Sequence, residues 1–340
     1  MSRFQIWISA LCVLLIGSFL LNLMLGSVAI PIDEIISIIF GNESSKQTWN
    51  FIIKEFRLPK AYTAILTGMG LSLSGLLMQT LFRNPLAGPF VLGISNGASL
   101  GVALLVMSGS ILFTGMLELG NWGLITAAIL GSSAILAMVL AVSVKVKDSV
   151  SLLIIGLMVG SATGAIVSVL QYFSEAKVIQ AYIIWTFGSL AGTSWEQLSI
   201  LAPIVLFGII LAFTAQKQLN TFLLGEDYAK GLGISVQKYR TIIIIATCLL
   251  AGSITAFCGP IAFIGLAVPH IARAVLNSAD HRRLIPSVLL IGAIIMLFCD
   301  MISQVPLKDT TLPINATTSL IGAPVVIWVV IRAKRLKSSI

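Results

Sequence analysis

Two ionisable side chains stand out because they lie inside apolar stretches of the sequence. Asp300 lies near the end of one stretch, and His270 follows a proline near the end of another. A carboxylate within a membrane span is a candidate for ion or proton coupling, and a histidine could carry a proton or bind a metal. However, Asp300 is close enough to the interface to reach water or cap a neighbouring helix, and His270 has no second ligand nearby. We therefore expect structural, hydrogen-bonded roles for both, and no metal site.

No motif for catalysis or nucleotide binding accompanies these residues. The sequence lacks the patterns G-x-x-x-x-G-K-[ST] and H-E-x-x-H, and its four cysteines all lie in apolar segments. It also lacks the set of mid-span charges that ion coupling requires. The sequence therefore predicts that the chain is not an enzyme and binds no cofactor itself. If the chain is a transporter, it has neither a nucleotide-binding motif nor coupling charges, so a partner must supply the energy.

The composition places the chain in a membrane. Of its 340 residues 57% are apolar and only 10% are charged, whereas about a quarter of the residues in soluble domains are charged. Ten apolar stretches are close to the roughly 20 residues that a helical span needs. They cover approximately residues 5–25, 60–81, 91–110, 122–143, 150–171, 196–214, 241–258, 261–276, 285–303 and 313–331. We predict an all-α polytopic membrane protein with about ten transmembrane helices, forming a single domain over residues 1–340. The seventh and eighth stretches could instead be one broken helix.

The distribution of basic residues predicts the orientation. With ten spans, 15 of the 21 lysines and arginines lie on one side of the membrane. Cytoplasmic loops carry the excess of basic residues, so both termini are expected in the cytoplasm. The net charge of +8 follows from this topology, and a nucleic-acid partner is not needed to explain it.

Small residues recur four apart in two of the predicted spans, which allows close helix packing in lipid. One stripe contains Gly93, Gly97 and Gly101, and the other contains Gly156, Gly160 and Gly164. Tight internal packing is the simpler interpretation. The alternative is that some of these glycines line a translocation path.

The longest external loop, about residues 26–59, ends in the sequence Arg57-Leu58-Pro59-Lys60. Pro59 suits the start of a helix, because the N–H that it lacks would have no partner there. Arg57 and Lys60 would then point into the external aqueous phase. They either anchor the second span at the interface or bind an acidic partner.

The largest cytoplasmic loop, about residues 216–240, contains a short helix-forming stretch between glycines. Its residues are Gly225, Glu226, Asp227, Tyr228, Ala229, Lys230, Gly231, Leu232 and Gly233. Acidic residues favour a helix N-terminus, and glycines can end the helix and reverse the chain. The stretch is either an inert connection or a lever that a soluble partner moves.

A set of motifs in fixed order resembles the FecCD-type permeases, the transmembrane subunits of type II ABC importers for iron–siderophore, haem and cobalamin. Besides the residues at 57–60, the similarity rests on Ser74-Gly75 with Gln79, Asn84-Pro85-Leu86-Ala87, residues 92–98, Gly259-Pro260-Ile261 with Gly265-Leu266, Pro269-His270-Ile271-Ala272-Arg273, Asp280-His281-Arg282, Leu312-Pro313-Ile314 and Gly322-Ala323-Pro324. Together they cover nearly the whole chain.

The resemblance implies a type II importer fold with a dimer of permeases, either identical or paralogous, around a translocation path. It also implies two cytoplasmic ATPase subunits that carry ATP and Mg, and an external solute-binding protein. The segment from Gly225 to Gly233 would contact the ATPase, and Arg57 and Lys60 would receive the binding protein. Relatives often carry an arginine where this chain has Gln304, so Lys308 is the candidate replacement. Asn315 stands where many relatives have glycine.

The expected function is therefore ATP-driven import of a metal chelate across the cytoplasmic membrane of a bacterium. An iron–siderophore complex is the leading candidate substrate, with cobalamin and haem as alternatives. An ion-coupled secondary transporter is the main rival. An intramembrane enzyme that uses His270 and Asp300 ranks third.

Overall fold

The computed structural model describes residues 3–26, 28–42, 44–108, 120–146, 148–304 and 311–337, and every regular element within these ranges is a helix. Seven helical runs are long and apolar enough to cross a membrane. They are α1 (Arg3–Met24), a run from Gln47 that ends with α4 (Leu58–Leu81), α7 (Asn121–Lys145), α8 (Ser149–Tyr172), α10 (Trp195–Thr214), α13 (Val236–Cys258) and α15 (His281–Gln304). Three shorter helical stretches are also apolar: α5 (Ile94–Met107), α14 (Ile264–Leu276) and the part Ile314–Trp328 of α16 (Ile314–Lys337). Each predicted span overlaps one of these ten helices, and the predicted fold class is confirmed.

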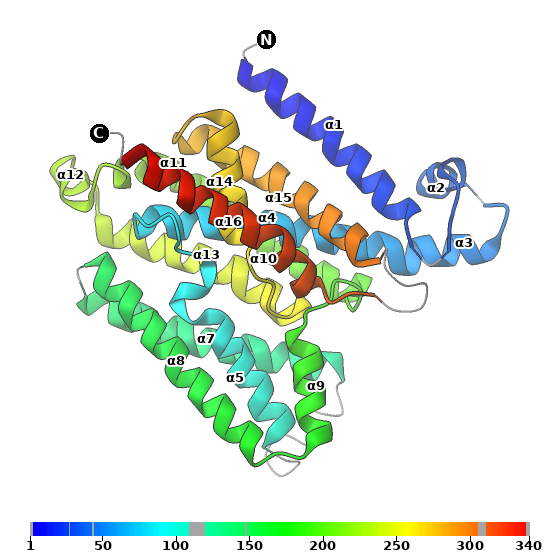
Figure 1. Ribbon diagram of the computed structural model, residues 1–340, viewed down its shortest axis with the longest axis horizontal. Coiled ribbons are helices and arrows are strands. Elements are labelled where there is room, and N and C mark those ends of the chain that lie inside the picture. The colour runs from blue at the N-terminus through cyan, green and yellow to red at the C-terminus, as the bar shows by residue number, and fades with distance from the viewer. Residues whose placement is uncertain are drawn as a thin grey trace.

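The helix α4 forms the centre of the bundle and packs against α13, α14 and α15 (Figure 1). Small residues bring the backbones together there. A Cβ atom at Gly75 would overlap the Gly265 backbone, and one at Gly68 would overlap the Gly292 backbone. Most of α4 is buried, because its small residues allow neighbouring helices to approach closely.

A second group of helices, α5, α7, α8 and α9 (Ala176–Thr186), lies below α4 in Figure 1. The sequence did not predict α9, whose 11 residues are too few to span a bilayer. The seventh and eighth predicted spans are two helices, α13 and α14, because the chain leaves the helical conformation at Gly259, where φ is +75°.

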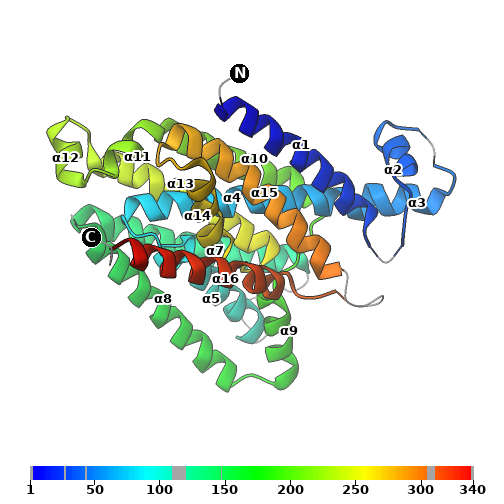
Figure 2. The same cartoon turned by 45° about the horizontal axis from the view of Figure 1, so that its top comes forward.

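The two ends of the bundle differ. In both views α11 (Gln216–Phe222) and α12 (Glu226–Gly231) lie at one end, which we call the α12 end (Figure 2). The helices α2 (Ile32–Ile39) and α3 (Gln47–Phe51) lie at the opposite end, called the α2 end. Connections predicted to be cytoplasmic meet at the α12 end, where Arg240 bonds to the Val146 carbonyl and Asn220 to Asp280.

The segment at 26–59 is more regular than the expected loop. Ile35 and Ile38 of α2 are buried, so this helix packs against the rest of the chain. A π-helix, Ile52–Arg57, then connects α3 directly to α4, so helical backbone already precedes Pro59. Proline cannot donate a backbone hydrogen bond, and its ring crowds the preceding turn, which a wider π turn accommodates.

Candidate functional site

The short helix predicted in the large cytoplasmic loop is present as α12. It begins after Gly225, which has φ of +115°, and the chain reverses at Gly233, which has φ of +76°. Both values lie in the region that favours glycine. The sequence pattern therefore predicted this element correctly, because its two ends depend on backbone conformations that other residues rarely adopt.

One face of α12 is open to a partner. Tyr228 is 53% exposed and Leu232 is 60% exposed, whereas Ala229 is fully buried. Asp227 and Lys230 form an ion pair of 2.9 Å on the exposed side. The helix thus presents an aromatic ring, an aliphatic side chain and a pair of opposite charges, which suits a protein contact better than a small ligand.

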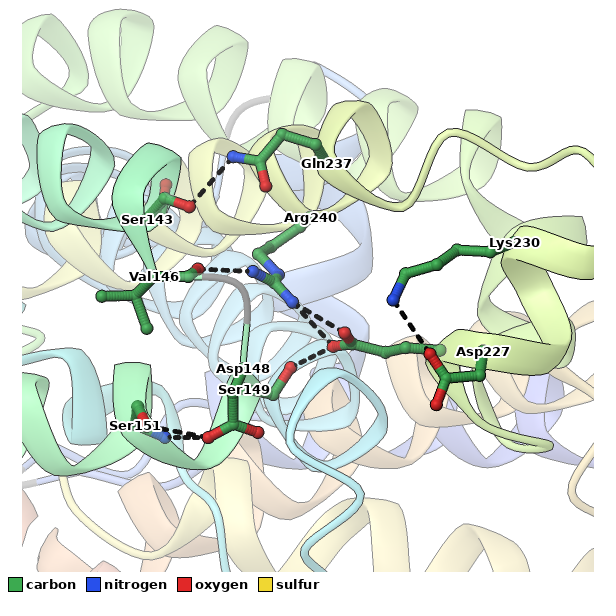
Figure 3. A network of polar contacts seen from close by, with 10 residues as sticks. Ser143, Val146, Asp148, Ser149, Ser151, Asp227, Lys230, Gln237 and Arg240 are labelled. Carbon is green, nitrogen blue, oxygen red and sulfur yellow. Dashed lines mark hydrogen bonds and ion pairs between the residues drawn. The ribbon is translucent and has the colours of Figure 1, made fainter.

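The opposite side of α12 is fixed to the bundle through Glu226, whose partners Arg240 and Ser149 are labelled in Figure 3. Its two carboxylate oxygens accept hydrogen bonds from Arg240 Nη2 at 2.8 and 2.9 Å, and one of them also accepts from Ser149 Oγ. Arg240 Nη1 donates to the Val146 carbonyl at 3.0 Å. This network joins α12 and α13 to the turn between α7 and α8.

A hollow of about 600 Å³ opens beside this network. Arg83, Asp148 and Lys230 are among its lining residues. Hydrogen bonds from Ser151, first of all from its backbone N–H, lower the pKa of the Asp148 carboxyl. Both acidic and basic side chains line the hollow. It therefore has no uniform charge that would select a small anion or cation.

The predicted external docking residues have partners within the chain. Arg57 is only 9% exposed, and its guanidinium donates to the carbonyls of Leu23 at 2.6 Å, Met24 at 3.2 Å and Val28. The expectation that this side chain points into water is wrong. The last carbonyls of α1 have no partner within the helix, and the guanidinium fork satisfies them.

Lys60 is also engaged. Its ammonium lies 2.9 Å from Asp300 Oδ1, and the side chain is 16% exposed. The other carboxylate oxygen, Oδ2, accepts from Asn22 Nδ2 and from Gln304 Nε2, both at 2.9 Å. Asp300 is therefore buried within a network that joins α1, α4 and α15. The expected structural role fits this arrangement, and Lys308 lies outside the described residues.

The glycine stripes contribute mainly to close packing. A Cβ at Gly97 would lie 2.6 Å from the Gly131 carbonyl oxygen, and one at Gly101 would overlap Ala127, so both residues let α5 approach α7. A Cβ at Gly156 would lie 2.5 Å from the carbonyl oxygen of Val91.

The remaining three glycines differ from one another. Gly93 has φ of +75°, and a Cβ there would lie 3.3 Å from the Gly156 carbonyl oxygen. The carbonyl of Gly160 accepts a hydrogen bond from Asn96 at 2.8 Å. Gly164 is exposed with open space around it, so it does not serve packing within the chain.

Two parts of these networks were missed from the sequence. Arg240 was counted among the cytoplasmic basic residues, but it is only 1% exposed and ion-paired. Its position in the first turns of a long apolar helix is the signal that could have identified it. Asn22 gives no such signal, because its partner Asp300 is 278 residues away in the sequence.

Other candidate chemistry is satisfied within the fold. His270 Nε2 lies 2.8 Å from the Pro85 carbonyl oxygen, in agreement with the expected hydrogen bond. Among the described residues, no group of three or more His, Cys, Asp or Glu side chains could hold a metal ion.

Comparison with known proteins agrees with this architecture. The family model described as "FecCD transport family" matches residues 14–332. The vitamin B12 import system permease protein BtuC of Klebsiella pneumoniae is 34% identical over 333 residues, which cover 98% of this chain and 95% of BtuC. The hemin transport system permease protein HmuU of Yersinia pestis is 33% identical over 298 residues, with 87% and 88% coverage.

A solved structure described as an inward-facing conformation of a metal-chelate type ABC transporter superposes with a TM-score of 0.82. It is 30% identical and covers 94% of this chain and 98% of its own. The fold and these relatives define a membrane transport permease, and the prediction of a transport subunit rather than an enzyme is confirmed. The family model covers nearly the whole chain, which therefore belongs to the FecCD transport family.

Proposed function

We propose that this chain is the membrane-spanning subunit of an ABC importer that moves a metal chelate into a bacterial cell by ATP-driven alternating access. The observation that carries the proposal is α12, a glycine-bounded helix with an open face at one end of the bundle. The names of the relatives support the chelate class, because vitamin B12 and hemin are both large metal complexes.

The proposed assembly contains a second permease subunit, identical or paralogous, and two ATPase subunits that bind ATP and Mg. The ATPases contact α12, so the α12 end faces the cytoplasm, and both termini of the chain are cytoplasmic. An external binding protein docks at the α2 end near Arg57 and Lys60, and Lys308 is a further candidate for contact with it. Lipid surrounds the remaining apolar surface, and nucleic acid has no part in this function.

We propose an iron–siderophore complex as the first substrate to test, and cobalamin and haem as the alternatives. The path between the two permeases holds such a ligand weakly, because a site that bound it tightly would slow its release. Gly164 is a candidate for the lining of the path, since it is exposed on α8. Competition for uptake among the three chelates would identify the substrate.

A second candidate is an ion-coupled secondary transporter, and the buried pair of Lys60 and Asp300 is the observation in its favour. Against it, both Asp300 oxygens already have partners. A coupling carboxylate must exchange its partners during each cycle.

The test is purification of the tagged chain from its own membranes in mild detergent, followed by identification and counting of the bound subunits. We expect a P-loop ATPase in equal number to the permease. A chain that is purified without an ATPase, and that transports in vesicles without ATP, would contradict the proposal.

A further inference from the structure

A buried arginine is the central residue of a joint between α12 and the start of α8. Arg240 lies in α13 and uses one nitrogen for both oxygens of Glu226 and another for the Val146 carbonyl. Ser149, the first residue of α8, donates to the same Glu226 carboxylate. The side chains that hold α12 in place are thus the ones that hold the turn before α8 (Figure 3).

The burial of this joint makes it stiff. Arg240 is 1% exposed, and the Glu226 side chain is 22% exposed. A guanidinium taken out of water needs its ionic partner, because an unpaired buried charge is very unfavourable. Several charge-assisted bonds also fix the planar group in one orientation. A displacement of Glu226 must therefore either carry Arg240 and Ser149 along or break these bonds.

The helices that meet at this joint differ in their freedom to move. In the apolar part of α13, 72% of the residues are buried within the chain, whereas in the apolar part of α8 only 28% are buried. The contacts of α8 within the chain are mainly with α5, the 3-10 turn at Pro89–Leu92 and α7. A force applied at α12 would therefore shift the start of α8 more readily than it would shift α13.

We propose that Arg240 is a positioning residue that transmits the movement of α12 to α8. Its contact on the α12 side is Glu226, its contact on the α8 side is the Val146 carbonyl, and Ser149 reinforces the link by donating to Glu226. This inference rests on the proposed function, because it assumes that an ATPase moves α12. The covalent links from α12 lead to α11 and α13, and neither leads to α8. The ionic joint supplies a second connection, which leads to the helix that carries Gly156, Gly160 and the exposed Gly164.

The experiment uses the whole transporter, with its ATPase and binding protein, reconstituted in lipid vesicles. Glu226→Gln, Arg240→Gln and Arg240→Lys are compared with Gln237→Ala. The control removes another bond between α13 and α7, from Gln237 to the Ser143 carbonyl at 3.1 Å, without touching α12. Uptake of the ferric siderophore and ATP hydrolysis are measured in the same vesicles.

Glu226→Gln and Arg240→Gln should lower the uptake per ATP hydrolysed by roughly tenfold, the scale of one charge-assisted hydrogen bond. Arg240→Lys should recover part of the loss, because it keeps the charge without the planar fork. Gln237→Ala should resemble the unaltered transporter. If either single variant does not fold, Glu226→Gln combined with Arg240→Gln carries the test, because it leaves no buried charge unpaired.

Hydrogen–deuterium exchange provides a readout that a purely structural role would not change. ATP should alter the exchange of residues 149–153 in the unaltered complex and in Gln237→Ala, but not in Glu226→Gln. A Glu226→Gln complex with full uptake per ATP and the normal ATP response at 149–153 would overturn the inference. Failure of the proposed function would look different, because the unaltered complex itself would then show no ATP-driven uptake.

Discussion

The Lys60 ammonium lies 2.9 Å from the Asp300 carboxylate, so an ion pair joins α4 to α15 at the α2 end of the bundle. Asp300 is 2% exposed, and Asn22 and Gln304 bond to its second oxygen. The acid that first suggested chemistry is thus enclosed by partners from α1, α4 and α15. Its position explains why an acid is tolerated inside an apolar helix.

Removing one member of this pair should be costly. Lys60→Met leaves a buried carboxylate without its cation, which typically costs about 3–5 kcal/mol of stability. Lys60→Met combined with Asp300→Leu should recover most of this loss, because no charge remains unpaired. Thermal unfolding in detergent would measure both effects. Equal stability of Lys60→Met and the unaltered protein would show that the pair does not stabilise the fold.

Arg57 offers a way to separate stability from docking. Arg57→Gln should lower the midpoint of thermal unfolding, because it loses charge-assisted bonds to the end of α1, each worth roughly 1.5–3 kcal/mol. Arg57→Lys keeps the charge but cannot bridge several carbonyls in the same way. We expect the lysine variant to retain binding-protein docking while remaining less stable. Docking that is unchanged even in Arg57→Gln would remove this residue from the proposed docking surface.

Gly75 and Gly164 form a matched pair of helical glycines. Gly75→Ala would push a Cβ into the Gly265 backbone, and overpacking of this kind costs about 1–3 kcal/mol. Gly164→Ala has open space around it and should be neutral or stabilising by roughly 0.5–1 kcal/mol, as is usual within helices. Unfolding of the two variants under identical conditions gives the comparison. A loss of stability at Gly164 equal to that at Gly75 would contradict the packing described above.

In the turn after α12, substitution of Gly233 should impair function, whereas substitution of Gly231 should be tolerated. Gly233→Val forces a β-branched residue to φ of +76°, which costs on the order of 1–3 kcal/mol. Gly231→Ala lies at the end of α12 with no atom within reach of the new methyl group. Only the valine variant should uncouple ATP hydrolysis from uptake. Normal uptake by Gly233→Val would exclude the proposed role of this turn.

Local signals account for the parts of this protein that the sequence predicted well. The ten spans follow from apolar runs, and α12 follows from acidic residues placed between glycines. The partners of Arg57 and Asp300 could not be predicted in this way. Arg57 bonds to carbonyls 34 and 33 residues earlier in the chain, and such contacts depend on where α1 ends in space. The π-helix before Pro59 was missed because its wider turn has no sequence period of its own.

The residues that line the substrate pathway are the hardest to predict from the sequence, because their exposure depends on contacts between distant segments. Gly156, Gly160 and Gly164 have identical spacing, yet only Gly164 is free of close neighbours within the chain. Spacing shows that a stripe exists on one face of a helix. It does not show which helix will cover that stripe, because this depends on the packing of segments distant in the sequence.

The most direct test of the account is uptake of a ferric siderophore by vesicles that contain the complete transporter, with and without ATP on the side of the ATPase. We expect uptake to require ATP and binding protein and to continue when all ion gradients are collapsed. Haem and cobalamin in separate vesicles would identify the cargo if the siderophore is not taken up. Uptake of any of the three that is driven by an ion gradient without ATP would contradict the account.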